Sequence, residues 1–332
     1  MGWTRSGRKG RFRYVDERGR VVVDPAHIER IERLAIPPAW RDVWISPRAN
    51  AKVQATGFDS AGRKQYVYNA DYRAAQEQAK FDRLIRFAEQ LPQLRAAMAE
   101  HLDNGDLDRD RVCAIALRLI NLGWFRVGSD RHAKASDTYG ITTLTKRHLS
   151  VEGTRIALAF TGKQKIQVHR SLVDEELAAA LRELLAVPGA RVFRYRRDGE
   201  LYNLTGERVN EYVKTHLGPE FTAKDFRTWG GTLLAAIAFA EKAGREDAPT
   251  KRSVTAGMRR VAEQLGNTPA VCRASYVSPA VVDQYLDGRT LEDFRPRHLR
   301  VVGARQTDLD PEEQALLSLL RSARIRRARK AA

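Results

Sequence analysis

Several residues beyond position 125 have side chains that can act on a phosphate ester. Arg126 follows a predicted helix in the stretch FRVG, and Lys163 lies in the predicted β-turn TGKQ. Arg227 lies near the start of a predicted helix in KDFRTWG. Asn267 and Tyr276 stand nine residues apart in GNTPAVCRASY. The set therefore combines three cations with an amide and a phenol.

Such a set meets the needs of phosphodiester cleavage without a metal or a nucleotide. Two guanidinium groups can fork onto the non-bridging oxygens and stabilise the charge on a pentacoordinate phosphorus. A lysine on a turn can protonate the leaving oxygen, and a phenol becomes a usable nucleophile among cations. Taken singly, each residue also has a plain structural explanation, such as Arg227 paired with Asp225. Spacing in the sequence does not bring these residues together.

Tyr276 lies at a predicted break between two short helices. Thr268 can cap the first helix, and Pro269 suits its first turn. The next stretch, SPAVVDQYLDG, repeats the signal with Ser278 as the cap and Gly288 as the stop. The phenol can therefore point out of the core, either as a reactive group or as a half-exposed aromatic.

Motifs for nucleotide and metal cofactors are missing from the sequence. There is no G-x-x-x-x-G-K-[ST] loop, and no G-x-G-x-x-G follows a predicted strand. The one dense acidic run, DNGDLDRD at 103–110, departs from the calcium-loop pattern at the glycine and at the closing glutamate. We read this run as a loop between helices, and we expect no metal site and no cofactor.

The charge balance predicts a polyanionic partner, with nucleic acid as the first choice. Lys and Arg number 58 against 41 Asp and Glu, which gives a net charge of +17. A ribosomal-type or merely soluble basic surface is the alternative. An anionic membrane is less favoured, because the mean hydropathy is negative and no basic amphipathic helix stands out. The basic end RSARIRRARK is read as a solvated or phosphate-facing helix.

The cysteine content and the N-terminal sequence predict a cytoplasmic protein. The two cysteines, Cys113 and Cys272, form no C-x-x-C pair, which fits a reducing compartment. The N-terminal stretch lacks the apolar core of a signal peptide, and no apolar run is long enough to span a membrane.

The elements that must position these groups change in character near residues 73–78. Before that point the segments RFRYV, RVVVD, DVWIS and QYVYN read as strands, with one helix after Asp24. Beyond it, helices are predicted from about 73, at about 109–124, and at 174–186, 206–217, 223–242, 251–265, 279–287 and 311–330. Three short strands, GITTLT, TRIALAF and KIQVHR, interrupt them. We therefore predict an α+β protein with domains at 1–75 and 76–332.

In their order along the chain, these motifs resemble the type IB DNA topoisomerases of the compact poxvirus and bacterial kind. That family carries R-[FV]-G, a lysine in a GK turn, KD-[LF]-RT, G-H-T-P, and a tyrosine nine residues later in SY. The matching stretches here are FRVG, TGKQ, KDFRTWG, GNTP and ASY. IPPAW, ISP and GRKQYVY also match, so the resemblance covers about residues 20–290.

The resemblance implies that a small β-rich lobe and a larger, mainly helical catalytic lobe close around duplex DNA as a C-shaped clamp. Gln65, Tyr66 and Tyr68 match the family's DNA-contacting segment, and Lys224 is expected to contact DNA as well. Alternation along a strand places Tyr66 and Tyr68 on one face and Gln65 on the other. At least one of these residues is therefore not expected to contact a base.

The resemblance also assigns roles within the catalytic set. Tyr276 is the nucleophile that forms a 3′-phosphotyrosyl link, Arg126 and Arg227 hold the phosphate, and Lys163 is the general acid. The expected enzyme acts as a monomer at the cytoplasmic nucleoid, without ATP or metal. Asn267 departs from the family's histidine, and an amide can donate a hydrogen bond but cannot carry a proton.

Two alternatives remain open at this point. A tyrosine recombinase uses the same chemistry, but the H-x-x-R box that usually precedes its tyrosine is missing before Tyr276. A basic DNA-binding protein without enzymatic activity could also retain such residues.

Overall fold

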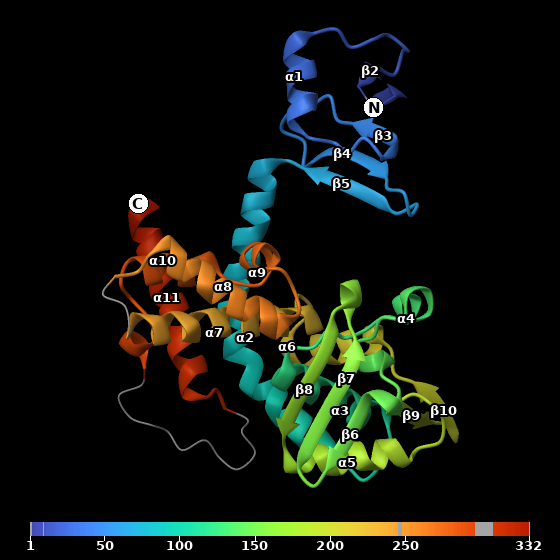
Figure 1. Cartoon of the computed structure of the whole chain (residues 1–332), viewed down its shortest axis with the longest axis vertical. Coiled ribbons are helices and arrows are strands. Elements are labelled where there is room, and N and C mark those ends of the chain that lie inside the picture. The colour runs from blue at the N-terminus through green and yellow to red at the C-terminus, as the bar shows by residue number, and fades with distance from the viewer. Residues whose placement is uncertain (1, 9, 245–247, 296–307, 332) are drawn as a thin grey trace. The chain divides into compact units, whose positions relative to one another are not determined.

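The computed structural model describes residues 2–8, 10–244, 248–295 and 308–331, and the chain divides into two compact units (Figure 1). The first unit is Met1–Phe81 and the second is Asp82–Ala332. Both helices and sheets are present, as predicted. Helix α2, Ala70–Asp103, begins in the first unit and continues into the second.

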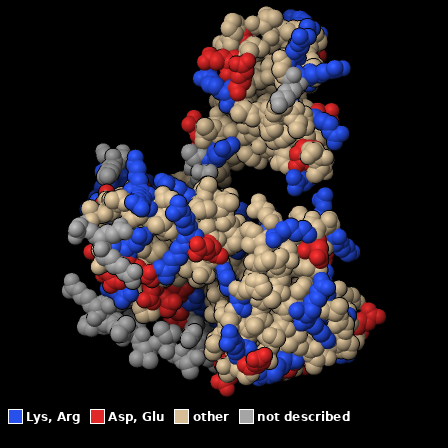
Figure 2. Space-filling view, viewed as in Figure 1, with Lys and Arg blue, Asp and Glu red and all other residues tan. Residues whose placement is uncertain are grey.

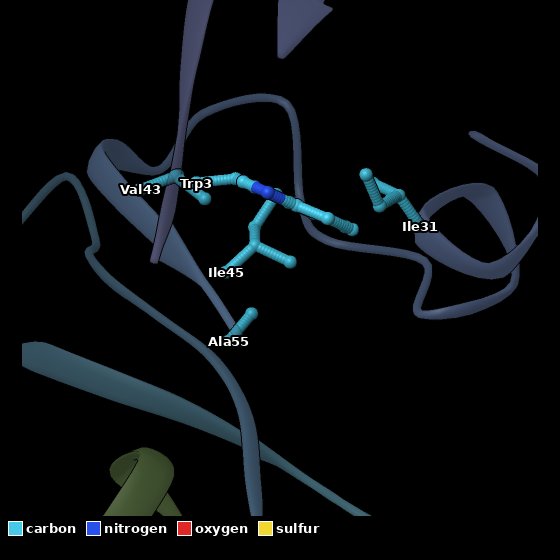
Figure 3. Packing of buried hydrophobic residues seen from close by; sticks show 5 residues of the cluster. All are labelled: Trp3, Ile31, Val43, Ile45 and Ala55. Atoms are coloured by element: carbon cyan, nitrogen blue, oxygen red, sulfur yellow. The ribbon is translucent and has the colours of Figure 1, made fainter. Parts of the chain in front are cut away.

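The first unit is an antiparallel sheet with one helix against it. The strand order is β2-β1-β3-β4-β5, and helix α1 spans Pro25–Arg33. The strands are β1 Trp3–Arg8, β2 Arg11–Val15, β3 Arg41–Ile45, β4 Val53–Phe58 and β5 Lys64–Tyr68. Figure 3 shows the core between the sheet and α1, which consists of Trp3, Ile31, Val43, Ile45 and Ala55.

The prediction of a strand at RVVVD is wrong. The chain reverses in a turn at Asp16, where the amide of Gly19 donates to the Asp16 carbonyl at 3.0 Å. Within the described part of the chain, a single bridge between Val15 and Val21 follows the turn, and Val23 is 79% exposed. The segment stays beside β2 only as far as Val22, whose amide donates to the Tyr14 carbonyl at 2.8 Å, so β propensity alone does not extend the pairing into a strand. The sheet is completed instead by β1 and β4, which sequence reasoning missed.

The second unit is mainly helical. The six helices predicted between residues 174 and 330 agree with the structure to within one residue at each end. The helices beyond α2 are α3 Arg109–Gly123, α4 Asp130–Ser136, α5 Glu175–Ala186, α6 Gly206–Leu217, α7 Ala223–Ala243, α8 Lys251–Leu265, α9 Pro269–Ser275, α10 Pro279–Leu286 and α11 Pro311–Ala331. The segment between α2 and α3 confirms the predicted loop between helices.

The second unit also holds a three-stranded antiparallel sheet in the order β6-β7-β8. Its strands are β6 Leu149–Glu152, β7 Arg155–Thr161 and β8 Gln167–Val173, and a short hairpin joins β9 Arg194–Arg197 to β10 Glu200–Asn203. The predicted hairpin around TGKQ is confirmed as β7 and β8. The prediction of a strand at GITTLT is wrong, because Ile141–Thr143 forms a 3-10 turn, and the third strand lies further along the chain.

Helix α3 is the centre of this unit. Its side chains from Val112 to Leu117, and again Leu119 and Ile120, are buried. It packs against α5, α6 and α7 and against the sheet through β8. Burial on nearly all sides fixes the place where α3 ends, and that end leads directly into the FRVG motif. Among the described residues, no helix is long and apolar enough to cross a membrane.

The basic C-terminal helix is tied to the rest of the second unit. Arg321 of α11 pairs with Glu89 at 2.6 Å, and Arg327 pairs with Asp82 at 2.7 Å. Arg326 pairs with Asp287 at 3.3 Å. The expectation of a solvated end is confirmed for these three arginines, whose side chains are 41–48% exposed although they pair with acids of α2 and of the residue after α10.

Candidate active site

Arg227 enters the site from the first turns of α7. Thr222 caps this helix together with Asp225, whose carboxylate also pairs with Arg83 at 3.3 Å. Asp225 therefore has other partners, and the ion pair between Arg227 and Asp225 that the sequence allowed does not form. Its Nη1 donates to the carbonyl of Trp124, and its Nη2 donates to the carbonyl of Leu265 at 2.8 Å.

Arg227 is a buried cation with no carboxylate partner among the residues that the structure describes. It is 4% exposed, and among the described residues no carboxylate is among the groups that shift its pKa. Burial lowers the pKa of this guanidinium, and the nearby Tyr276 phenol opposes that shift. A buried charge held by two backbone carbonyls and the Tyr276 oxygen, with no carboxylate among these partners, can bind an anion.

Arg126 lies in the extended segment that follows α3. The amide of Ile141 donates to the Arg126 carbonyl at 3.0 Å, and the amide of Thr142 donates to the Val127 carbonyl at 2.8 Å. The 3-10 turn that replaces the predicted strand therefore holds the FRVG segment in place. Burial and the like charge of Arg227 lower the pKa of Arg126 to about 10, so the guanidinium stays cationic at neutral pH.

Asn267 is the direct partner of Arg126. The Arg126 Nη2 donates to Oδ1 of Asn267 at 2.7 Å and to the Gly266 carbonyl at 3.3 Å. The two residues lie 141 positions apart in the sequence. Because Oδ1 accepts from Arg126, the Asn267 amide nitrogen is the donor that remains, and it makes a long contact of 3.4 Å with the Leu265 carbonyl.

Tyr276 ends helix α9. At the other end of this helix, Thr268 is the cap and Pro269 is the first residue, as predicted. Its amide donates to the Cys272 carbonyl at 2.9 Å, and its own carbonyl accepts from Thr232 of α7 at 3.1 Å. Helices α7 and α8 pack together, as do α8 and α9, in the orange part of Figure 1. This packing brings the half-buried Tyr276 ring to the Arg227 guanidinium, whose carbon lies 5.0 Å from the ring centroid.

The charges around Tyr276 favour its phenolate. Burial alone would raise the pKa of the phenol. The positive charge of Arg227, with smaller contributions from Arg126 and Lys224, outweighs burial, so that the pKa lies below that of an ordinary tyrosine. A phenol with a lowered pKa among cations is a suitable nucleophile. Lys224, predicted to contact DNA, is exposed on the first turn of α7.

Lys163 lies in the turn between β7 and β8, as predicted, and is exposed. Gly162 and Ile166 of this turn line a cavity of about 60 Å³ together with Arg126 and Arg227. Within the described residues, however, the Lys163 ammonium makes no hydrogen bond or ion pair. The structure therefore brings the two arginines, Asn267 and Tyr276 together, and places the turn that carries Lys163 beside them.

Comparisons with known proteins identify the family of the chain. A family model described as the catalytic core of eukaryotic DNA topoisomerase I matches residues 69–289. A second model, the N-terminal domain of bacterial DNA topoisomerase IB, matches residues 11–59. The chain belongs to the type IB DNA topoisomerases. Enzymes of this class are isomerases that act on DNA topology.

Two viral relatives illustrate the similarity. The DNA topoisomerase 1B of Acanthamoeba polyphaga mimivirus is 32% identical over 290 residues, which is 85% of this chain and 86% of its own. The DNA topoisomerase 1B of Vaccinia virus (strain Copenhagen) is 23% identical over 280 residues, or 81% and 85% of the two chains. The resemblance inferred from the motifs is thus confirmed.

The residues of the first unit that were expected to contact DNA lie on strand β5 of the topoisomerase. Tyr66 and Tyr68 lie on one face of the strand and are 46% and 40% exposed. Their rings are stacked, with the ring centroids 6.0 Å apart. Gln65 faces the other way, half-buried, and donates to Asp59 at 2.9 Å. The predicted alternation is confirmed, and neither tyrosine belongs to the core. Whether Gln65, Tyr66 and Tyr68 contact DNA stays a prediction.

Sequence reasoning missed three residues that shape this topoisomerase site. Trp124, whose carbonyl holds Arg227, has left-handed backbone angles of φ 50° and ψ 35°, which cost a non-glycine residue roughly 1–2 kcal/mol. Gly231 lets α7 approach Tyr276, because a Cβ there would lie 2.8 Å from the Tyr276 carbonyl oxygen. Gly230 stands against the Trp124 ring. The adjacent glycines in RTWGGT were the available signal, since glycine inside a helix needs a reason.

Proposed function

We propose that this topoisomerase relaxes supercoiled duplex DNA by cutting and resealing one strand through Tyr276. The observation that carries the proposal is the buried Arg227, free of any acidic partner among the described residues, with its guanidinium 5.0 Å from the Tyr276 ring. We further propose that the two units close around the duplex as a C-shaped clamp and that the enzyme acts as a monomer at the cytoplasmic nucleoid.

In the first step, the oxygen of the Tyr276 phenolate attacks a backbone phosphorus and the bond from phosphorus to the 5′-oxygen breaks. A 3′-phosphotyrosyl link and a free 5′-hydroxyl result. Arg126 and Arg227 donate to the non-bridging oxygens as charge builds on them. Two guanidiniums that now bind backbone carbonyls and Asn267 can exchange these partners for phosphate oxygens, which form stronger, charge-assisted bonds.

Lys163 is proposed to supply the proton that the departing 5′-oxygen needs. An exposed ammonium on a turn can follow the DNA strand and reach the leaving oxygen. The cut strand then swivels about its partner, and the 5′-hydroxyl attacks the phosphotyrosyl phosphorus to reseal the nick. Lys163 takes its proton back, and Tyr276 leaves. Because the phosphotyrosyl bond conserves the energy of the broken linkage, the proposed cycle needs no ATP and no metal.

Duplex DNA is the proposed partner, and much of its affinity would come from charge. The net charge is +17, and Lys and Arg side chains are spread over the visible surface of both units (Figure 2). Each phosphate neutralised by a cation releases counterions, so affinity should fall steeply with salt concentration. The exposed stack of Tyr66 and Tyr68 on β5 would add direct contacts with the duplex.

A single assay tests the proposed reaction against its alternatives. Supercoiled plasmid incubated with the protein in EDTA without ATP should become relaxed, and gel electrophoresis would resolve the topoisomers. Recombinant products joined between two duplexes would favour a tyrosine recombinase. A mobility shift without any change in linking number would favour a DNA-binding protein without enzymatic activity.

Asn267→Ala should slow single-turnover cleavage by about tenfold or more, because a hydrogen bond to a charged group contributes about 1.5–3 kcal/mol. The observed acceptor for Arg126 would be lost, together with an amide donor that can reach a phosphate oxygen. Asn267→His should retain most of the rate, since a neutral imidazole can accept from Arg126 and donate with its other nitrogen. Single-turnover cleavage rates would be measured on a duplex from which the cut-off end of the strand dissociates, so that it is not resealed.

The pair of variants separates hydrogen bonding from proton transfer at this position. A rate for Asn267→His far above the parent would mean that a titratable group is needed there. Equal rates for Asn267→Ala and the parent would remove Asn267 from the site.

A further inference from the structure

The end of α3 connects the two arginines of the site through one residue, Trp124. Its amide closes the helix by donating to the Ile120 carbonyl at 2.8 Å. Its left-handed backbone then turns the chain, so that its own carbonyl accepts a hydrogen bond from Nη1 of Arg227. Arg126 follows two residues later. The direction of the Trp124 carbonyl and the start of the Arg126 segment are therefore set by the same turn.

A left-handed conformation is uncommon for a bulky residue, so the surroundings must hold it there. The Trp124 indole lies against α7 at Gly230, where a Cβ would collide with Cδ1 and Nε1 of the ring. Gly230 is fully helical and lies three residues after Arg227, on nearly the same face of α7. The missing side chain of Gly230 thus makes a notch in the surface of α7, and the indole occupies it.

We propose that Trp124 is a positioning residue for the cleavage reaction, seated in the Gly230 notch so that its carbonyl fixes the Arg227 guanidinium beside Tyr276. The proposal rests on the transesterification at Tyr276 put forward above. Trp124 itself touches no reacting atom. It acts through Arg227, whose second terminal nitrogen is held by Leu265 at the end of α8. With both carbonyls in place, the guanidinium has one orientation toward the tyrosine ring.

Gly230→Ala tests the notch directly. The added methyl group should push the indole away from α7, move the Trp124 carbonyl and release Arg227. Single-turnover cleavage should slow by about 10- to 100-fold, the effect expected when a catalytic group moves by about 1 Å. DNA affinity, measured by fluorescence anisotropy, should stay the same because the surface charges are unchanged.

Gly244→Ala is the matched control at the other end of α7. Gly244 has an ordinary helical φ of −71°, and the nearest atom to a Cβ there would lie 3.8 Å away. Both substitutions replace glycine by alanine, which has the higher helix propensity, so the two variants differ only in the space around the added methyl group. The control should therefore cleave at the parental rate. A parent that fails to cleave DNA would overturn the proposed function. A cleaving parent with equal rates for Gly230→Ala and Gly244→Ala would overturn the role of Trp124 alone.

Two further variants separate positioning from general stability. If Gly230→Ala folds poorly, Trp124→Ala takes its place as the test. This variant empties the notch without adding atoms and should also slow cleavage. In an Arg227→Ala background, Gly230→Ala should have no additional effect on the cleavage rate, because residues that act through one group are not additive. Full additivity of the two substitutions would mean that Trp124 only packs, and would contradict the proposal.

Discussion

Tyr276→Phe should abolish cleavage and relaxation of supercoiled DNA while leaving DNA binding intact. The variant loses only the phenolic oxygen, which is the proposed nucleophile, and removal of a nucleophile typically lowers the rate by about 10⁴-fold or more. The ring still fills its place over the Arg227 guanidinium. The measurement is the covalent complex: denaturing electrophoresis after incubation with labelled duplex should show protein-linked DNA for the parent and none for the variant.

Tyr202→Phe is a suitable control for this change. Tyr202 lies on β10, is 43% exposed, and donates its hydroxyl proton to Glu200 at 3.1 Å. Its loss should leave both cleavage and relaxation at the parental level. A covalent complex that persists in Tyr276→Phe would assign the nucleophile to another residue, and the proposed mechanism would then be wrong.

The helices of the catalytic unit were predictable because their signals are local. Thr222 and Thr250 cap α7 and α8 with side-chain contacts to residues three positions away. Apolar residues at helical spacing then define the buried face of each helix. The predicted ranges for α7 and α8 therefore required no knowledge of the rest of the chain.

The wrong strand predictions depended on partners far away in the sequence. Ile141 and Thr142 have β-branched side chains, but their amides bind the carbonyls of Arg126 and Val127 instead of a neighbouring strand. A β-branched segment shows its pattern in the sequence, whereas its partner does not. The same segment turned out to hold the FRVG motif, so the incorrect prediction concealed a structural support of the site.

The contacts of the site were out of reach of sequence spacing for the same reason. The bond between Arg126 and Asn267 and the approach of Arg227 to Tyr276 both depend on how α3, α7, α8 and α9 pack. Ordered motifs identified these residues through a family resemblance, which carries no geometry. The left-handed backbone at Trp124 had no local signal, since tryptophan rarely adopts it.

Lys163→Ala should slow cleavage by roughly 10²- to 10⁴-fold, the usual contribution of a general acid. The structure leaves Lys163 exposed in the turn between β7 and β8, so its removal should not affect stability. Lys165→Ala is the matched control, because it removes the same charge from the same turn and Lys165 is bound to the Ser136 carbonyl. Cleavage by the control should stay close to the parental rate, while both variants lose the same electrostatic attraction to DNA.

A modified substrate then decides whether Lys163 acts through its proton. When sulfur replaces the bridging 5′-oxygen at the cleavage site, the leaving group is a thiolate, whose conjugate acid has a pKa of about 8.5, and it departs without protonation. Lys163→Ala should therefore cleave this duplex at nearly the parental rate. If Lys163 instead stabilised charge on the non-bridging oxygens, the defect would persist with sulfur, because those oxygens are unchanged. Restoration of the rate by sulfur would assign the proton to Lys163, and a persisting defect would withdraw that assignment.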